Sequence, residues 1–500
     1  MKKIINLVLL ILPLVGIAQK QGSIWYFGTR YGLDFSSGTP IQTFGGMTGY
    51  ANGQLVGNMG CSSLCDANGK LLFYSDNAQL WNCNHKMMPH GDSLTCSRAT
   101  IQGSIIVPKP GSNHIFYVFT CEDHDDFLYP QITKGYCYSV VDMCLDSARG
   151  DIINGQKNIQ LTDSASQQIC VCADMQEAGY WIVGHKAVSD QIWAWHLTAA
   201  GISSPVISII SKPYDLNHLS TEGWLKFNPS GTTLAIAITD TSRSGFLLYD
   251  FNSSTGLLSN LRRATIDSPS GNASVNSLEF SPDGSKLFVS LFGTVDQSTH
   301  PLKPKRLYQY DMNAGNWNSI LASRKTLCSV LDSFNTAMSG LQLGPDGKIY
   351  LCTRTSPGRV GRINYPNLSG TAAGFDSVAI ILSSPANGRY FDFPGIIAGY
   401  KYINGIPCVK PASVNHSDAN PAIEFFPNPV KQTGILRISG ISDLQGLQLT
   451  IADAFGRTVK KMVLNSNPFS IDLSTASSGV YSYQLFQKGG LIKVGTFVIN

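Results

Sequence analysis

The sequence predicts an all-β protein: a β-propeller followed by a small C-terminal β-sandwich. Composition is the first observation, because charged residues make up only 14% of the chain while aromatics make up 10% and glycines number 48. That mix suits many short strands joined by tight turns. The second observation is a hairpin-forming repeat, and the third is a cysteine-free run of short alternating strands at residues 423–500. With 500 residues, the chain is too long for one compact core, so two or more domains are expected.

The N-terminus has the pattern of a secretory signal peptide over residues 1–18. Two lysines follow Met1, an apolar run extends from Ile4 to Ile17, and small residues precede the cleavage predicted after Ala18. This run is too short for a stable membrane span, and no other segment is apolar for long enough. We therefore expect an exported protein with no transmembrane segment.

A repeat defines the predicted propeller, which covers residues 22–402. It reads LKFNPSG at 225–231, LEFSPDG at 278–284 and LQLGPDG at 341–347, with a weaker copy, LCDANG, at 64–69. Proline presets φ in each turn, glycine supplies a positive φ, and the flanking apolar residues give two strands one buried face. A spacing of about 50 to 60 residues is typical of propeller blades. Seven blades fit the length, with six or eight as alternatives.

Further strands are expected between the repeats at 115–119, 180–183, 191–195, 246–251 and 306–311. The segment 281–288, SPDGSKLF, resembles the repeat of TolB-type and WD-like propellers. The opening section, with WYFG at 25–28 and LLFYSD at 71–76, resembles a group of secreted Bacteroidota propellers whose function is largely undescribed. These resemblances imply the architecture and not an activity, because propellers host many unrelated functions.

Residues 403–422 are polar and proline-rich, which predicts a linker. Beyond it, strands are expected near 435–439, 447–452, 458–464, 469–473, 480–486 and 491–499, a pattern typical of an antiparallel sandwich. Pro427-Asn428-Pro429, the segment 451–459 and the segment 471–481 resemble the type A C-terminal sorting domain of Bacteroidota type IX secretion. This resemblance implies that residues 423–500 engage the type IX machinery and direct the protein through the periplasm to the cell surface or beyond. The alternative is an ordinary accessory sandwich.

Motifs for catalysis are missing from the sequence, which has no nucleophile elbow, phosphate loop or zinc-protease helix in a suitable context. We therefore predict no catalytic residue and no cofactor. The net charge of +4 is scattered, which argues against a nucleic-acid partner. His85, His90, His114 and His185 are candidates to line one face of the ring, although isolated histidines beside strands are more often structural.

Trp193 and Trp195 project to the same side of one strand and are candidates for stacking on a sugar. Packing between blades is the favoured alternative for them.

Twelve cysteines lie between Cys61 and Cys408, and in an exported protein disulfides are expected. Cys61/Cys65 and Cys83/Cys96 are candidate local pairs, but the connectivity does not follow from the sequence. Whether a metal binds is left open. Cys170-Val171-Cys172, the Cys61–Cys65 spacing and the acidic stretch 121–126 are the candidates, with disulfides, buried thiols or a solvated loop favoured.

Three functions are compatible with these features. We expect an extracellular binding or adhesion module for an unknown glycan or protein, since no catalytic constellation is evident. The alternative is a carbohydrate-active enzyme, a lyase or glycosidase, which would need acidic groups converging at the funnel. A purely structural role in surface adhesion is the third.

Overall fold

The computed structural model of the chain describes residues 20–47, 50–51, 54–55, 60–98, 100–121, 135–174, 179–187, 189–209, 223–238, 244–266, 274–292, 305–330, 338–353, 358–383, 392–400, 422–439, 444–487 and 490–500. The chain forms two compact units, residues 1–408 and residues 409–500. The predicted signal peptide and the predicted linker, apart from Ala422, lie outside the described residues.

The first unit contains seven sheets of three to five strands within its described residues, and each sheet is built from consecutive strands. Blade 1 is β1 (Ile24–Phe27), β2 (Tyr31–Asp34) and β3 (Ile41–Phe44), and blade 2 is β6 (Ser62–Cys65), β7 (Leu71–Ser75) and β8 (Leu80–Asn82). Blade 3 is β9 (Ser104–Pro108), β10 (Ile115–Cys121), β11 (Tyr136–Asp142), β12 (Asp151–Ile152) and β13 (Ile159–Gln160). Blade 4 is β14 (Ile169–Ala173), β15 (Tyr180–His185), β16 (Gln191–Thr198), β17 (Gly201–Ile202) and β18 (Val206–Ile209).

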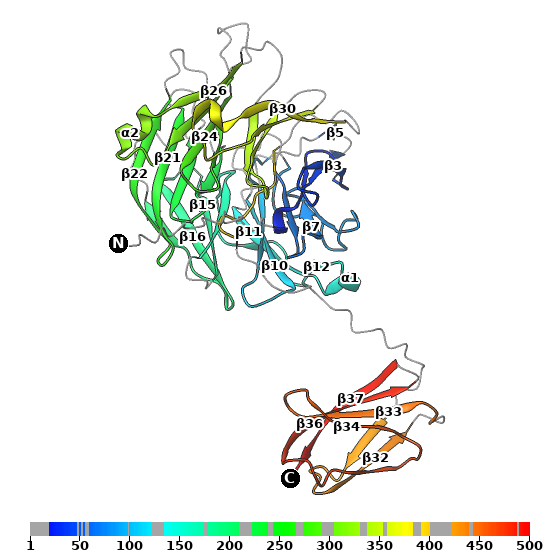
Figure 1. Cartoon of the computed structure of the whole chain (residues 1–500). Coiled ribbons are helices and arrows are strands. Elements are labelled where there is room, and N and C mark those ends of the chain that lie inside the picture. The colour runs from blue at the N-terminus through cyan, green and yellow to red at the C-terminus, as the bar shows by residue number, and fades with distance from the viewer. Residues whose placement is uncertain are drawn as a thin grey trace, which may run out of the picture. The chain divides into compact units, whose positions relative to one another are not determined.

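The remaining three blades have four strands each. Blade 5 is β19 (Leu225–Phe227), β20 (Thr233–Ile238), β21 (Gly245–Asn252) and β22 (Leu257–Thr265). Blade 6 is β23 (Ser274–Phe280), β24 (Lys286–Phe292), β25 (Lys305–Asp311) and β26 (Lys325–Val330). Blade 7 is β27 (Met338–Leu343), β28 (Ile349–Thr353), β29 (Gly358–Ile363) and β30 (Phe375–Leu382). A hairpin of β4 (Tyr50–Ala51) and β5 (Gln54–Leu55), and short helices α1 (Leu145–Ala148) and α2 (Trp317–Ala322), complete the labelled elements of Figure 1 in this unit.

The seven sheets form a closed ring, as predicted. The first strands of successive sheets contact one another, in the order β1, β6, β9, β14, β19, β23 and β27. Seven clusters of buried apolar side chains lie between neighbouring sheets, and one of them joins blade 1 to blade 7 through Trp25, Tyr350 and Phe393. Gln42 of β3 also exchanges hydrogen bonds with Ser383, just after β30. Figure 1 shows the first blade, in blue, beside the last, in olive.

The repeat turns have the geometry that the sequence predicts. Gly231, Gly284 and Gly347 have φ of 67°, 71° and 75°. Each closes its turn by donating its backbone N–H to the carbonyl of the residue three positions earlier, at 2.8–3.0 Å. A residue with a side chain is strained at such φ values, which explains glycine at the end of every copy.

After blade 7 the chain returns across the middle of the ring. Residues 392–400, here called the exit segment, form parallel bridges with two inner strands, Ser62 with Gly395 and Cys172 with Ala398. Ala398 donates its N–H to the carbonyl of Val171 at 2.9 Å, and Gly395 donates to Cys61 at 3.1 Å. The exit segment therefore ties blades 2 and 4 together from the inside.

The second unit is a two-sheet sandwich. One sheet has the order β31 (Ala422–Phe426), β32 (Thr433–Ser439) and β35 (Phe469–Asp472). The other has β34 (Thr458–Val463), β33 (Leu447–Ala452), β36 (Gly479–Gln487) and β37 (Gly490–Ile499). Leucine, isoleucine and tyrosine side chains from both sheets fill its core. All six predicted strands are present, and β31 is an additional one. No helix in the described residues has the length and apolar character needed to cross a bilayer.

Candidate functional site

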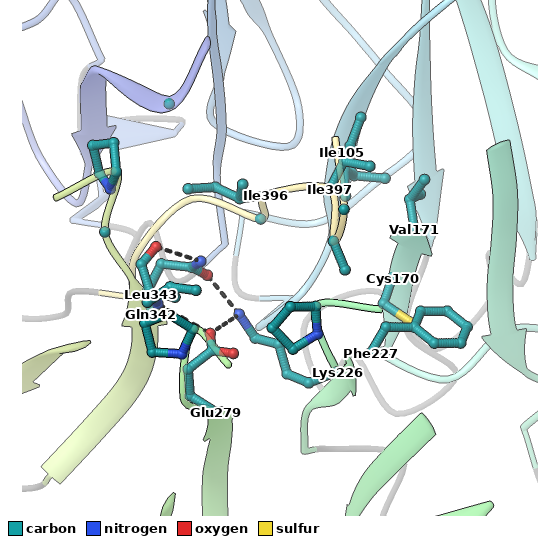
Figure 2. Close-up of a pocket in the computed structure, with 18 of the residues that line it drawn as sticks. Ile105, Cys170, Val171, Lys226, Phe227, Glu279, Gln342, Leu343, Ile396 and Ile397 are labelled. Carbon is teal, nitrogen blue, oxygen red and sulfur yellow. Dashed lines mark hydrogen bonds and ion pairs between the residues drawn. The ribbon is translucent and has the colours of Figure 1, made fainter. Parts of the chain in front are cut away.

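A cavity of about 670 Å³ lies at the centre of the ring. Inner strands of blades 3 to 7 form its wall, and Gly395–Gly399 of the exit segment forms another side. The repeat turns also reach it, through residues such as Pro229, Pro282 and Pro345. Figure 2 shows a small polar group on one side of the cavity, with Ile105, Val171, Ile396 and Ile397 on the other. The repeat that defines the fold therefore also builds the cavity.

The polar group consists of Lys226, Glu279 and Gln342, which occupy the same second position in the three copies of the repeat. Because consecutive blades are related by rotation about the ring axis, equivalent positions converge at the centre. Lys226 Nζ donates to Glu279 Oε2 at 2.8 Å and to Gln342 Oε1 at 2.5 Å, as the dashed lines in Figure 2 show. The side chains of Lys226 and Glu279 are only 8% and 6% exposed.

Further contacts complete this ion pair. Glu279 Oε2 accepts from the backbone N–H of Leu343 at 3.1 Å, and Oε1 accepts from the N–H of Phe280 at 3.0 Å. Lys226 Nζ also lies 4.9 Å from the centre of the Trp224 ring, within the range of a cation–π contact. The charges of Lys226 and Glu279 are thus largely compensated within the protein, which is the condition for burying them.

Two further carboxylates line the cavity, and both are engaged in their own turns. Asp283 Oδ1 accepts from Ser281 Oγ at 2.7 Å and from the N–H of Ser285 at 2.9 Å. Asp346 Oδ2 accepts from Tyr350 Oη at 2.8 Å and lies 3.5 Å from a lysine Nζ. These carboxylates hold the turn geometry, as Asp at such positions commonly does.

Cys170 places a thiol in the same cavity, next to Lys226. Burial raises the pKa of this thiol strongly, and the nearby Lys226 charge only partly opposes the shift. The group therefore stays a neutral, weakly polar thiol, and it is not an activated nucleophile.

The four candidate histidines do not converge. His85 contacts Tyr74 Oη at 3.1 Å, and His90 and His114 pair with Asp151 and Asp142 at 2.6 and 2.9 Å. His185 donates Nε2–H to the carbonyl of Ser189 at 2.8 Å. The described residues that line the cavity include none of these four side chains, and each has a local structural contact instead.

Trp193 and Trp195 lie on the same side of β16, as predicted, with ring centres 5.9 Å apart. Trp195 is fully buried between blades 3 and 4, where its ring lies 5.4 Å from that of Tyr136. Trp193 is half-buried, and its Nε1 donates to Gln191 at 3.0 Å. A pair of exposed rings for a sugar is thus not present here, and packing between blades explains Trp195.

The predicted local disulfides are wrong. Cys61, Cys65, Cys83 and Cys96 are all without a disulfide. Ser62–Cys65 is an extended strand, so four residue steps place Cys61 and Cys65 roughly 13 Å apart, beyond the reach of a disulfide. Cysteine is common at fully buried positions, which accounts for several of the other thiols.

The metal candidates gain no support from the described residues. Cys170 and Cys172 are buried in β14, and burial raises the pKa of both thiols, which opposes the thiolate form that zinc requires. Residues 122–126 of the acidic stretch lie outside the described residues. A different group, His114, Asp142 and Cys144, has ligand atoms within 4.8 Å of one another. Cys144, however, takes part in a disulfide and cannot offer a thiolate.

The second unit has a prominent surface turn at residues 453–457, within the segment 451–459 whose sequence resembles part of the sorting domain. Asp453 Oδ1 accepts from the N–H groups of Phe455 and Arg457, and Arg457 Nε donates to Asp453 Oδ2 at 2.8 Å. Gly456 has φ of 79° and completes the turn. Phe455 at its tip is 85% exposed.

The fold therefore defines a β-propeller with a separate C-terminal sandwich, and comparison with known proteins identifies the sandwich. Residues 424–500 match the family described as secretion system C-terminal sorting domain. Such domains mark proteins that are secreted or anchored on the cell surface, so this chain is cargo of type IX secretion and its sorting domain engages that machinery. No curated protein matches the chain.

Solved structures similar to the chain are distant. The periplasmic gluconolactonase PpgL of Pseudomonas aeruginosa is 12% identical, with 80% of this chain and 96% of that chain covered and a TM-score of 0.31. Hydrazine synthase of Kuenenia stuttgartiensis is 14% identical, with 63% and 79% covered and a TM-score of 0.37. An oligogalacturonate lyase in complex with manganese is 12% identical, with 67% and 83% covered and a TM-score of 0.34. At these distances none of them bears on the chemistry of this chain.

Proposed function

We propose that the propeller is an extracellular binding module that takes up its ligand in the central cavity. The cavity's volume of about 670 Å³ is typical of a small-molecule site, and its wall combines apolar and polar groups. The observation that carries the proposal is that each carboxylate lining the cavity is already engaged by other groups of the protein. Glu279 is paired with Lys226, and Asp283 and Asp346 serve their own turns.

Catalysis by a lyase or glycosidase needs a different arrangement. A glycosidase requires one carboxyl group that donates a proton and a second that acts as nucleophile or base. A carboxylate whose oxygens already accept from a lysine and two backbone N–H groups is poorly placed for either role, because those contacts occupy its oxygens. Binding is therefore the function that this geometry supports best.

A screen of the purified mature protein tests the choice between binding and catalysis. We expect a retained ligand and no turnover when glycans, peptides and small extracellular metabolites are presented to it. The ligand should compete with any fluorescent reporter placed in the cavity. Turnover of any polysaccharide would contradict the proposal, and loss of that turnover in Glu279→Gln would place the chemistry in the cavity.

A deletion tests the delivery of the protein. Removal of residues 421–500 should leave a folded propeller in the periplasm, because the sorting domain that engages the secretion machinery is gone. All seven tryptophans lie in residues 1–408, so their fluorescence reports whether the truncated propeller is folded. A reporter protein carrying residues 403–500 is the matched control and should reach the surface. Unimpaired surface delivery of the truncated chain would show that the sandwich is not the sorting signal.

A further inference from the structure

The two sheets of the sorting domain have outer faces of different composition. We propose that the type IX machinery binds the outer face of the four-stranded sheet, β34-β33-β36-β37. The family match places the sorting function in residues 424–500 without selecting a surface. The proposal rests on that sorting role and is independent of what the propeller binds.

The alternation of buried and exposed positions defines this outer face. Apolar residues of β33 and β36 are buried in the core at every second position, so the residues between them point outward. The strand register aligns Lys461, Thr450, Gln484 and Val494 as one outward row across the four strands. The other outward residues are valine, alanine, phenylalanine, serine, threonine and glutamine. Lys461 is therefore the one charged residue among the described residues of this face.

The same face exposes several apolar side chains. Val463, Val480 and Val494 are 59%, 55% and 56% exposed, although burial of a valine side chain is favourable. The turn between β33 and β34 places Phe455, which is 85% exposed, at one end of the sheet. Exposed apolar side chains combined with few charges are typical of the core of a protein–protein interface.

The outer face of the three-stranded sheet, β31-β32-β35, is charged instead. Glu424, Arg437 and Asp472 all point outward and are exposed. Glu424 stands opposite Arg437, whose guanidinium also lies 5.0 Å from the centre of the Phe426 ring. A protein that docked on this face would have to remove water from three charged groups, which is costly. Of the two faces, the four-stranded one is therefore better suited to bind a partner.

The partner on this face is identified by the role of the domain and by the charge of Lys461. The sorting domain engages the secretion machinery, so that machinery must contact some surface of it. The complementary surface should be mainly apolar and neutral, with a carboxylate opposite Lys461. A second copy of the same face is a poorer partner, because its described residues offer no carboxylate to Lys461.

Glutamate substitutions of the full-length chain test the choice of face in cells with a functional type IX system. Val480→Glu and Val494→Glu should each lower the amount of propeller at the cell surface by about tenfold, because an unpaired carboxylate would be buried in the contact. Val494→Thr keeps a neutral β-branched side chain and should retain delivery. Ser470→Glu is the matched control, because it adds the same charge at an exposed position of the other face and should also retain delivery.

Site-specific crosslinking identifies the partner directly. A photoreactive benzoylphenylalanine in place of Gln484, an exposed residue of the central strand β36, should crosslink to a protein of the type IX machinery. The same group in place of Ser470 should give no such product. Resistance of the sandwich to limited proteolysis in the purified mature chain shows whether each variant is folded.

Several results would overturn the proposal. These are normal delivery of Val480→Glu and Val494→Glu, an equal loss of delivery in Ser470→Glu, and a crosslink from position 484 that reaches only a second copy of the chain or no protein. If the glutamate variants lose their resistance to proteolysis, the crosslinks from positions 484 and 470 decide. Normal delivery after removal of residues 421–500 would instead refute the sorting role itself, which distinguishes that failure from a wrong choice of face.

Discussion

Replacing Lys226 with methionine would leave the carboxylate of Glu279 buried without its cation. The two side chains are 8% and 6% exposed and come from neighbouring blades, 5 and 6. Their contact at 2.8 Å is the central element of a polar connection that Gln342 extends to blade 7. The pair should therefore contribute to cohesion between three blades, and a double-mutant cycle can measure that contribution.

The expected changes in the free energy of unfolding follow from the burial of the Lys226 and Glu279 side chains. Removal of one partner of a buried ion pair typically costs about 3–5 kcal/mol. Lys226→Met should fall near the lower end, about 3 kcal/mol, because two backbone N–H groups still stabilise the Glu279 carboxylate. Glu279→Met should cost a similar amount, since Lys226 keeps Gln342 and the Trp224 ring. The double variant should cost less than the sum of the two single variants by at least about 2 kcal/mol, because apolar side chains of similar volume replace both charges. It should still be less stable than the wild type, because the N–H groups of Phe280 and Leu343 lose their acceptor.

Urea unfolding of the mature chain, followed by tryptophan fluorescence, measures these differences. The signal reports the propeller alone, because residues 409–500 contain no tryptophan. The exposed pair of Lys157 and Asp92, 3.0 Å apart, is the matched control and should show a coupling below about 1 kcal/mol. Single variants that each cost less than about 1 kcal/mol, with additive effects in the double variant, would refute the reasoning that this pair connects the blades.

Three further outcomes are expected. Trp195→Ala should lower the free energy of unfolding by about 3–5 kcal/mol, and the half-buried Trp193→Ala by no more than about 2 kcal/mol. Equal costs in urea titrations would contradict the packing role of Trp195. Burial lowers the pKa of His85 and His185, so the unfolded chain takes up protons first as the pH falls, and the propeller should lose stability below about pH 6.5. Replacing both histidines with glutamine should flatten the dependence of the free energy of unfolding on pH. An unchanged pH dependence would contradict the role given to these two histidines. Asp392→Ala should cost about 1–3 kcal/mol in thermal or urea unfolding, because the N–H of Gly340 loses its acceptor at 2.7 Å, and a neutral effect would argue against the exit segment as a tether.

Local chemistry made the blades predictable from the sequence. The turn glycines at 231, 284 and 347 need positive φ, and the alternation on either side fixes two strands, so the hairpins follow without knowledge of distant contacts. The segments expected at 246–251 and 306–311 lie within β21 and β25, the third strands of their blades. Seven blades, the number favoured from length, are present in the described part of the chain.

The site was less accessible to sequence reasoning, although one signal was available. Lys226, Glu279 and Gln342 stand at the same position of three aligned repeats, and the symmetry of a ring brings equivalent positions together. A charged residue in an otherwise apolar inner strand was the sign that it needed a partner in the next blade. The candidate histidines and tryptophans were chosen by residue type, without regard to the position of each residue in the repeat. This polar group was therefore missed.

The exit segment could not be predicted, because its contacts join residues far apart in the chain. Asp392 accepts from Gly340 of blade 7, Gly395 donates to Cys61 beside blade 2, and Ala398 pairs with blade 4. No local pattern in residues 392–400 encodes these partners. The Cys61/Cys65 and Cys83/Cys96 pairs were wrong because spacing along the chain does not give a distance until the structure between two cysteines is known.

The exit segment has a consequence for how binding and stability are connected. In the described residues each blade is built from consecutive strands, so no strand is shared between the two ends of the ring. Closure therefore depends on side-chain packing around Trp25 and Phe393, on the hydrogen bonds between Gln42 and Ser383, and on the segment that crosses the centre. The same segment supplies Ile396 and Ile397 to the cavity wall. A ligand in the cavity must then bind the closed ring in preference to an opened one, and by linkage it should stabilise the closure itself.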